Sequence, residues 1–181
     1  MFNAHLTHSN GHPLTKNVFQ TFVLAVSLVL MSVGLHLNTA FAVPSEPEIV
    51  DVVTIQHQGK GIVPSYTLPI YQVGEVRFLS AGVGIEERQA TYPPFPLKLI
   101  FAQTGGAFLS GVSVSIKDQA GKELANISED QTAGPWLFLD LAPGLYNITA
   151  VRKDGTTIHK TIKAPKGKSK DIYLHWPTPK G

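Results

Sequence analysis

Short stretches of alternating apolar and polar residues follow one another from residue 97 to near the end of the chain. Residues 112–117 show the simplest form, in which serines separate Val112, Val114 and Ile116. Because successive side chains of a β-strand point to opposite faces, such a stretch predicts a strand with one buried face. Seven strands are predicted in all, at residues 97–102, 112–117, 122–128, 136–139, 145–152, 156–163 and 170–176. Of these, 122–128 is a weaker stretch and 136–139 is a short apolar one.

Turn signals separate these stretches. Asp118 and Gly121 enclose one predicted turn, and Asp154-Gly155 gives the strongest hairpin signal, for which we expect a tight two-residue turn. Lys160 interrupts the apolar face of its stretch, which is typical of an edge strand. Short strands divided by turns at such regular spacing indicate a sandwich rather than parallel βαβ units.

We therefore expect an all-β fold. The predicted domain is a small antiparallel Greek-key β-sandwich of about seven strands over residues 96–176, followed by a short tail at 177–181. Trp136 lies between Pro135 and a short apolar stretch, and we expect its ring to fill the sandwich interior.

The region at 43–95 reads as an extended N-terminal segment with possible edge strands. An apolar run at 49–55 predicts one edge strand, 75–79 a second strand, and 86–89 a brief helical turn. Prolines argue against a central strand wherever they fall, since proline lacks a backbone donor. They occupy positions 44, 47, 64 and 69. We expect this segment to add little to the sandwich core.

The first 42 residues have the order of a secretory signal peptide. A lone Lys16 precedes an apolar stretch at 18–37, and the small-residue site Ala40-Phe41-Ala42 follows. Cleavage there would start the mature chain near Val43 and place it in the periplasm or outside the cell. The alternative is an uncleaved membrane anchor, because the apolar stretch covers 20 residues. After cleavage we expect no further contact with the membrane.

The cysteine content and the net charge exclude some kinds of covalent linkage and some classes of partner. The chain has no cysteine, so neither a disulfide nor a lipid anchor at the leader junction is available. Residues 43–181 hold 14 basic and 13 acidic side chains, a net charge of +1. Although 160–170 is locally positive, no basic stripe runs along the chain, and we expect no nucleic-acid partner.

The histidines and serines do not form a known catalytic or metal-binding pattern. After the leader only His57, His159 and His175 remain, and none begins an H-x-x-E, so the ligands of a zinc peptidase are missing. A two-histidine copper or zinc site at His159 and His175 is one alternative, and solvated surface histidines are the other. The chain also lacks a G-x-S-x-G elbow. We expect no enzyme activity, no cofactor and no metal.

The run Leu141-Ala142-Pro143-Gly144-Leu145-Tyr146 resembles the carboxypeptidase regulatory-like domain, a prealbumin-like sandwich, and the likeness extends over about 96–176. The resemblance implies a non-catalytic accessory or binding module. In physical terms, Pro-Gly makes the turn, and a buried Tyr146 is expected to donate its hydroxyl to nearby backbone. A leader, a glycine-rich segment and one sandwich also resemble small bacterial envelope proteins.

The glycine-rich segment is the most unusual stretch and supplies the candidate interaction surface. It contains Gly82, Gly84, Glu86, Glu87 and Arg88. Two carboxylates beside the loop would repel a phosphate. The stretch is therefore interpreted either as a turn that crosses one end of the sandwich or as a docking surface.

The functional expectation is an exported, non-catalytic binding or accessory module of the bacterial cell envelope. Its partner would be another envelope protein or a polymer, recognised through loops and an exposed edge strand. The alternative is a structural or assembly component, in which the region before the sandwich pairs with a second copy or with a larger complex.

Overall fold

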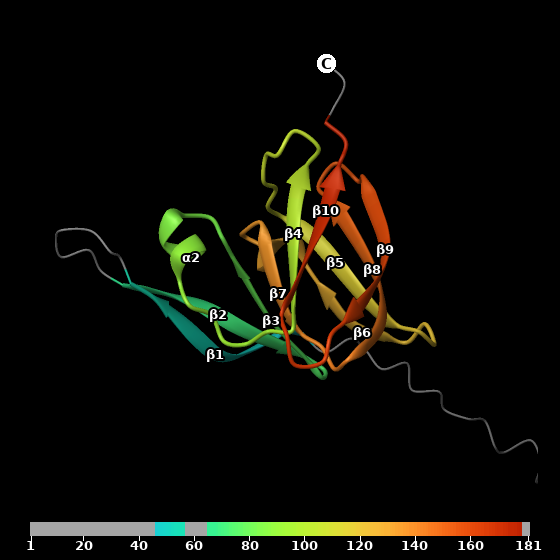
Figure 1. Cartoon of the computed structure of the whole chain (residues 1–181), viewed down its shortest axis with the longest axis horizontal. Helices are drawn as coiled ribbons and strands as arrows, with labels where there is room; N and C mark the ends of the chain where they lie inside the picture. Colours follow the sequence, from blue (N-terminus) through green and yellow to red (C-terminus); the bar gives the residue numbers. More distant parts are fainter. Residues whose placement is uncertain (1–45, 57–64, 179–181) are drawn as a thin grey trace, which may run out of the picture. The chain divides into compact units, whose positions relative to one another are not determined.

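The computed structural model describes residues 46–56 and 65–178, and every structural statement below concerns these residues (Figure 1). The predicted leader and His57 lie outside them. Ten strands form a six-stranded sheet in the order β1-β2-β3-β7-β4-β10 and a four-stranded sheet in the order β6-β5-β8-β9. The all-β prediction is confirmed.

The strands are β1 (Glu48–Ile55), β2 (Tyr66–Val73), β3 (Val76–Ala81), β4 (Leu97–Gln103), β5 (Val112–Asp118), β6 (Glu123–Ile127), β7 (Trp136–Asp140), β8 (Gly144–Arg152), β9 (Thr157–Ala164) and β10 (Lys170–Trp176). One helical turn, α2 (Ile85–Gln89), follows β3, and a 3-10 turn, η1 (Glu129–Gln131), follows β6. The helical turn expected at 86–89 is confirmed by α2.

The seven strands expected after residue 96 are present as β4 to β10. Their predicted apolar faces are buried: Leu97, Leu99 and Phe101 of β4 are each 0% exposed, as are Val112 and Val114 of β5. These side chains meet between the two sheets in the main core, so the period-two pattern identified the core face correctly.

One strand pair departs from the antiparallel expectation. β10 runs parallel to β4, in a register that places Lys170 beside Leu97 and Trp176 beside Gln103. The chain reaches β10 from β9, which belongs to the other sheet, so β10 crosses to the six-stranded sheet before it pairs. A strand's own pattern shows which face is buried but not the direction of its neighbour, and for this reason the mixed sheet was not predicted.

The N-terminal segment contributes more to the core than expected. β1 is an edge strand, as predicted, but β3 lies between β2 and β7 inside the larger sheet. Val76 and Phe78 of β3 are 2% and 0% exposed and belong to the main core. The expectation that this segment adds little to the core was wrong. β3 pairs with β7 inside the larger sheet and places two side chains in the main core.

Pro69 lies inside β2, where the proline rule argued against a central strand. It pairs with Val52 of β1, but β2 pairs with β3 only from Tyr71 onward. At Pro69 the strand therefore has a ladder neighbour on one side only, and the missing N–H need not interrupt a second ladder.

A second buried cluster covers the outer face of the larger sheet. Its members are Val53, Ile55, Ile70, Leu79, Ala81, Phe95 and Phe138. Trp136 packs against this cluster and not in the sandwich interior, which corrects the sequence-based expectation. Strand alternation explains the error: Leu137 and Leu139 of β7 face the main core, so Trp136 must face the opposite side.

The Asp154-Gly155 hairpin forms, but with a three-residue loop and not the two-residue turn expected. Arg152 N donates to Thr156 O at 3.0 Å and encloses the loop. Only Gly155 has a positive φ, of 80°, whereas a two-residue type I′ turn needs two such residues. Asp154 instead accepts a hydrogen bond from Thr156 N at 3.0 Å.

Candidate functional site

The predicted interaction surface is built around Glu87, whose side chain is 6% exposed. Its Oε2 accepts hydrogen bonds from Gly82 N at 2.6 Å and from Val83 N at 3.0 Å. Its Oε1 accepts a third from the Tyr66 hydroxyl at 3.0 Å. The carboxylate thus satisfies two consecutive backbone donors of the glycine-rich loop and ties this loop to β2.

Two further side chains close the loop. The Tyr92 hydroxyl donates to Glu87 O at 2.6 Å, and Arg88 Nε donates to Gly82 O at 2.9 Å. Burial raises the pKa of Tyr92 well above its ordinary value, and the Glu87 charge adds to this effect. Loss of water and the bond to Glu87 also raise the pKa of Tyr66. Both hydroxyls therefore stay protonated and continue to donate at neutral pH.

The five residues of this surface differ in their access to a partner. Gly82 and Glu87 are buried, Gly84 and Glu86 are half-buried, and only Arg88 is exposed. A side chain on Gly82 would collide with the Trp136 ring, which covers it. These placements support the interpretation of the stretch as a structural turn rather than a docking surface, because the Glu87 carboxylate is used for hydrogen bonds within the loop.

The exposed parts of this region are mainly apolar. Val83 and Ile85 are 60% and 58% exposed, and Phe108, over which the Arg88 guanidinium lies at 5.2 Å from the ring centre, is 45% exposed. A docking partner would meet these side chains and Arg88, and not the buried Gly82 or Glu87.

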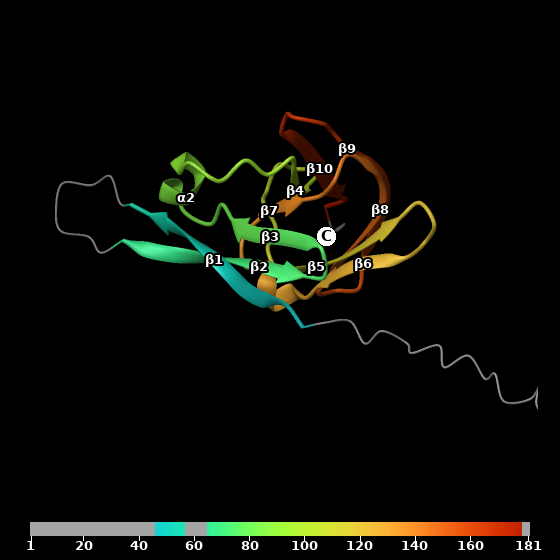
Figure 2. The same cartoon turned by 90° about the horizontal axis from the view of Figure 1, so that it is seen from below.

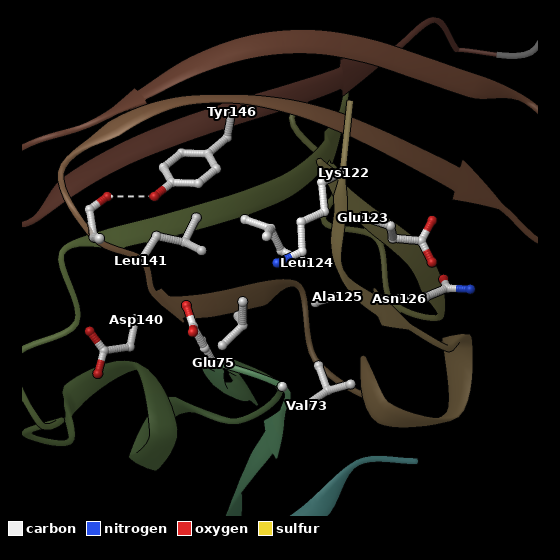
Figure 3. Close-up of a pocket in the computed structure, with 13 residues that line it drawn as sticks. Val73, Glu75, Lys122, Glu123, Leu124, Ala125, Asn126, Asp140, Leu141 and Tyr146 are labelled. Carbon is white, nitrogen blue, oxygen red and sulfur yellow. Dashed lines mark hydrogen bonds between the residues drawn. The ribbon is translucent and has the colours of Figure 1, made fainter. Parts of the chain in front are cut away.

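A cavity of about 380 Å³ lies on the other side of the sandwich (Figure 3). Figures 1 and 2 place α2 and the β5–β6 turn on opposite sides, and the cavity lies beside this turn. Three segments far apart in sequence surround it: the β2–β3 turn, the start of β6 and the β7–β8 turn. Sequence reasoning missed this cavity because it belongs to no single motif.

The cavity has an apolar floor and a charged rim. Val73, Val76, Leu124, Ala125, Leu141 and Tyr146 supply the floor. Glu75, Glu123 and Asp140 place three carboxylates around it, against one ammonium from Lys122. In Figure 3, Asp140 and Glu123 point outward at opposite sides of the view, and Lys122 extends toward Leu124.

Tyr146 holds the β7–β8 wall of the cavity. Its hydroxyl donates to Ala142 O at 2.8 Å, so the predicted tyrosine-to-backbone bond is present, as the dashed line in Figure 3 shows. Burial raises the pKa of Tyr146, and the Asp118 charge acts in the same direction. The bond therefore joins Tyr146, on the cavity floor, to the backbone just before the Pro143-Gly144 turn.

β1 forms an open edge of the larger sheet. Its neighbour on one side is β2, and within the described residues no strand pairs with its other side. Ile49, Val50 and Val52 are 62%, 45% and 50% exposed. The register shifts between Ile49 and Asp51, so Val50 forms a bulge. An apolar, unpaired edge of this kind is a common place for another strand to bind.

The two late histidines do not form a pair within one sheet. His159 lies on β9, where its Nδ1 is 3.1 Å from Thr149 Oγ1, and His175 lies on β10 in the other sheet, stacked on Tyr173 at 5.5 Å between ring centres. Over residues 46–56 and 65–178, no group of three or more metal-ligating side chains comes together. Both His159 and His175 are exposed.

In the described part of the chain, no helix is both long and apolar enough to span a bilayer. The chain was also compared with protein-family models, curated proteins and solved structures. No family model matches, and neither other comparison found a significant match.

Proposed function

We propose that this protein is an exported, non-catalytic binding module of the bacterial cell envelope that binds an extended segment of another polypeptide along β1. The observation that carries the proposal is the exposed, apolar edge of β1. Binding in this way would add a seventh strand to the larger sheet. Main-chain hydrogen bonds would supply affinity, and the side chains of β1 would supply selectivity.

The side chains of β1 favour a particular kind of segment. Glu48 and Asp51 are exposed, and no basic residue lies in this strand. Carboxylates on an edge oppose pairing with another acidic strand and favour one that carries lysine or arginine. The proposed partner segment is therefore apolar and basic in alternation.

The C-terminal end of β1 is anchored to the protein, so the strand can serve as a template. Val53 and Ile55 are 8% and 0% exposed and pack into the second cluster, whereas residues 48–52 are exposed. A partner strand would order few residues of this protein on binding, and the entropic cost would fall mainly on the partner.

A photo-crosslinking amino acid at position 52 tests the proposal in exporting cells. The expected result is one crosslinked envelope polypeptide whose yield falls when Asp51 is changed to lysine. The matched control carries the crosslinker at Leu145, another exposed apolar residue, which lies on β8. Equal crosslinking from both positions would show that the contact is non-specific and would contradict the proposal.

Export and cleavage of the leader are tested separately from binding at β1. N-terminal sequencing of the periplasmic protein should give a chain that begins near Val43. Full-length protein recovered in the membrane fraction would contradict cleavage and would leave the test of β1 valid.

A further inference from the structure

A lysine-rich loop lies at the same end of the sandwich as the acidic cavity. The loop joins β9 to β10 and contains the exposed residues Lys166 and Lys168, with Gly167 at its tip in the left-handed conformation, φ +76°. Lys163 and Lys170 flank it and are also exposed. Within the described residues none of these four lysines forms an ion pair. The loop therefore carries positive charges that no nearby carboxylate of the described residues neutralises.

The strand register fixes where the loop and the cavity lie. Ala164, at the end of β9, pairs with Gly144 at the start of β8, and Asp140 to Ala142, just before Gly144, line the cavity. Figure 1 shows the β9–β10 connection and the β2–β3 turn at the same, lower end. The loop belongs to the β9 edge of the four-stranded sheet and the cavity to its β6 edge. Three strand spacings, about 14 Å, separate these edges.

We infer that the cavity binds the lysine-rich loop of a second copy of this chain. Because both features lie at one end but at opposite edges, a two-fold rotation places the loop of each copy over the cavity of the other. Such an interface contains every contact twice, as a symmetric dimer requires. This inference depends neither on export nor on the β1 edge.

The chemistry of the cavity suits a lysine from a loop tip. The apolar floor, which includes Leu124 and Leu141, accepts the aliphatic stem. At the rim, Glu75 and Glu123 accept the ammonium, since Asp140 already pairs with Arg77 at 3.8 Å. Glu75 is exposed and, within the described residues, forms no ion pair, so its charge is available. Lys122 opposes an incoming ammonium, and its removal should strengthen the dimer.

Sedimentation velocity of the full chain, expressed with its own N-terminal segment, measures the association. The wild type should dimerise reversibly at about 50 mM salt, and its dissociation constant should rise at least about tenfold at about 500 mM salt. Lys166→Glu should weaken the dimer at least about tenfold, since each change acts twice in the interface. Lys153→Glu is the matched control, because Lys153 is an exposed lysine of the β8–β9 hairpin loop, outside the proposed interface.

A charge-exchange experiment identifies the two contacting surfaces. Lys166→Glu with Lys168→Glu gives one variant, and Glu75→Lys with Glu123→Lys gives the other. Each should be monomeric alone, because its loop and cavity carry the same sign of charge. An equimolar mixture should form a heterodimer, in which both reciprocal contacts join opposite charges.

Four results would overturn the inference. The first is a monomeric wild type at about 500 µM protein and low salt, a concentration at which weak specific dimers are populated. The second is a mixture of the two exchanged variants that stays monomeric while each remains folded by circular dichroism. The third is a dimer that Lys122→Ala weakens. The fourth is a dimer that Asp51→Lys in β1 abolishes and the loop and cavity variants do not, because the copies would then associate through the edge strand.

Discussion

Replacement of Glu87 tests whether this buried carboxylate is the structural centre of the glycine-rich loop. Glu87→Ala removes the acceptor for Gly82 N, Val83 N and the Tyr66 hydroxyl. The bond from Gly82 N is buried, whereas Tyr66 and Val83 are 42% and 60% exposed and their donors can turn to water. The Gly82 N–H therefore determines most of the cost.

The magnitude follows mainly from the buried Gly82 bond. Net contributions of about 1.5 to 3 kcal/mol are typical for a hydrogen bond to a charged group, and relief of the buried charge offsets part of the loss. We expect Glu87→Ala to lower the free energy of unfolding by about 2 kcal/mol. Glu87→Gln keeps one oxygen for both N–H groups and should cost only about 1 kcal/mol.

Urea unfolding followed by tryptophan fluorescence measures both changes, because Trp136 covers Gly82 and reports on the loop. Glu48→Ala is the control: it removes the same charge from an exposed position and should change stability by less than about 0.5 kcal/mol. A loss below about 1 kcal/mol for Glu87→Ala, or equal losses for alanine and glutamine, would refute the role assigned to the carboxylate.

Two further predictions concern the core and alkaline pH. Phe78→Ala should cost about 3 to 5 kcal/mol, since Phe78 is 0% exposed in the main core, and differential scanning calorimetry should show this loss; an unchanged midpoint would mean that β3 is dispensable. Tyr92 has a raised pKa in the folded protein, so its contribution is complete below pH 10 and is lost as pH rises further. Unfolding free energy should fall above about pH 10, by at most about 1.4 kcal/mol per pH unit for this group, and Tyr92→Phe should remove that part of the slope.

Local patterns predicted individual strands well. Val112, Val114 and Ile116 identified both the strand and its buried face, and the interruption at Lys160 identified β9 as an edge. Each of these conclusions uses only neighbouring residues, whose side-chain direction the strand geometry determines. The tyrosine-to-backbone bond of Tyr146 was predictable for the same reason, since its partner lies four residues upstream.

Features that join distant segments were not predictable in this way. The parallel pairing of β10 with β4 depends on how the chain crosses between sheets, which no strand pattern records. The acidic cavity needs three turns to meet, so its carboxylates look like ordinary surface charges along the chain. Glu87 was placed on a possible docking surface because nothing in the sequence shows that Tyr66 and Gly82 converge on it.

The position of β7 restricts the order in which the larger sheet can assemble. β3 and β4 are successive strands in the chain, yet β7 lies between them and pairs with both. Neither β3 nor β4 can pair with β7 until residues Trp136–Asp140 have left the ribosome. β4 gains its other neighbour only when β10, near the end of the chain, has been made. Such late, long-range closure slows folding and leaves two unpaired edges open during synthesis.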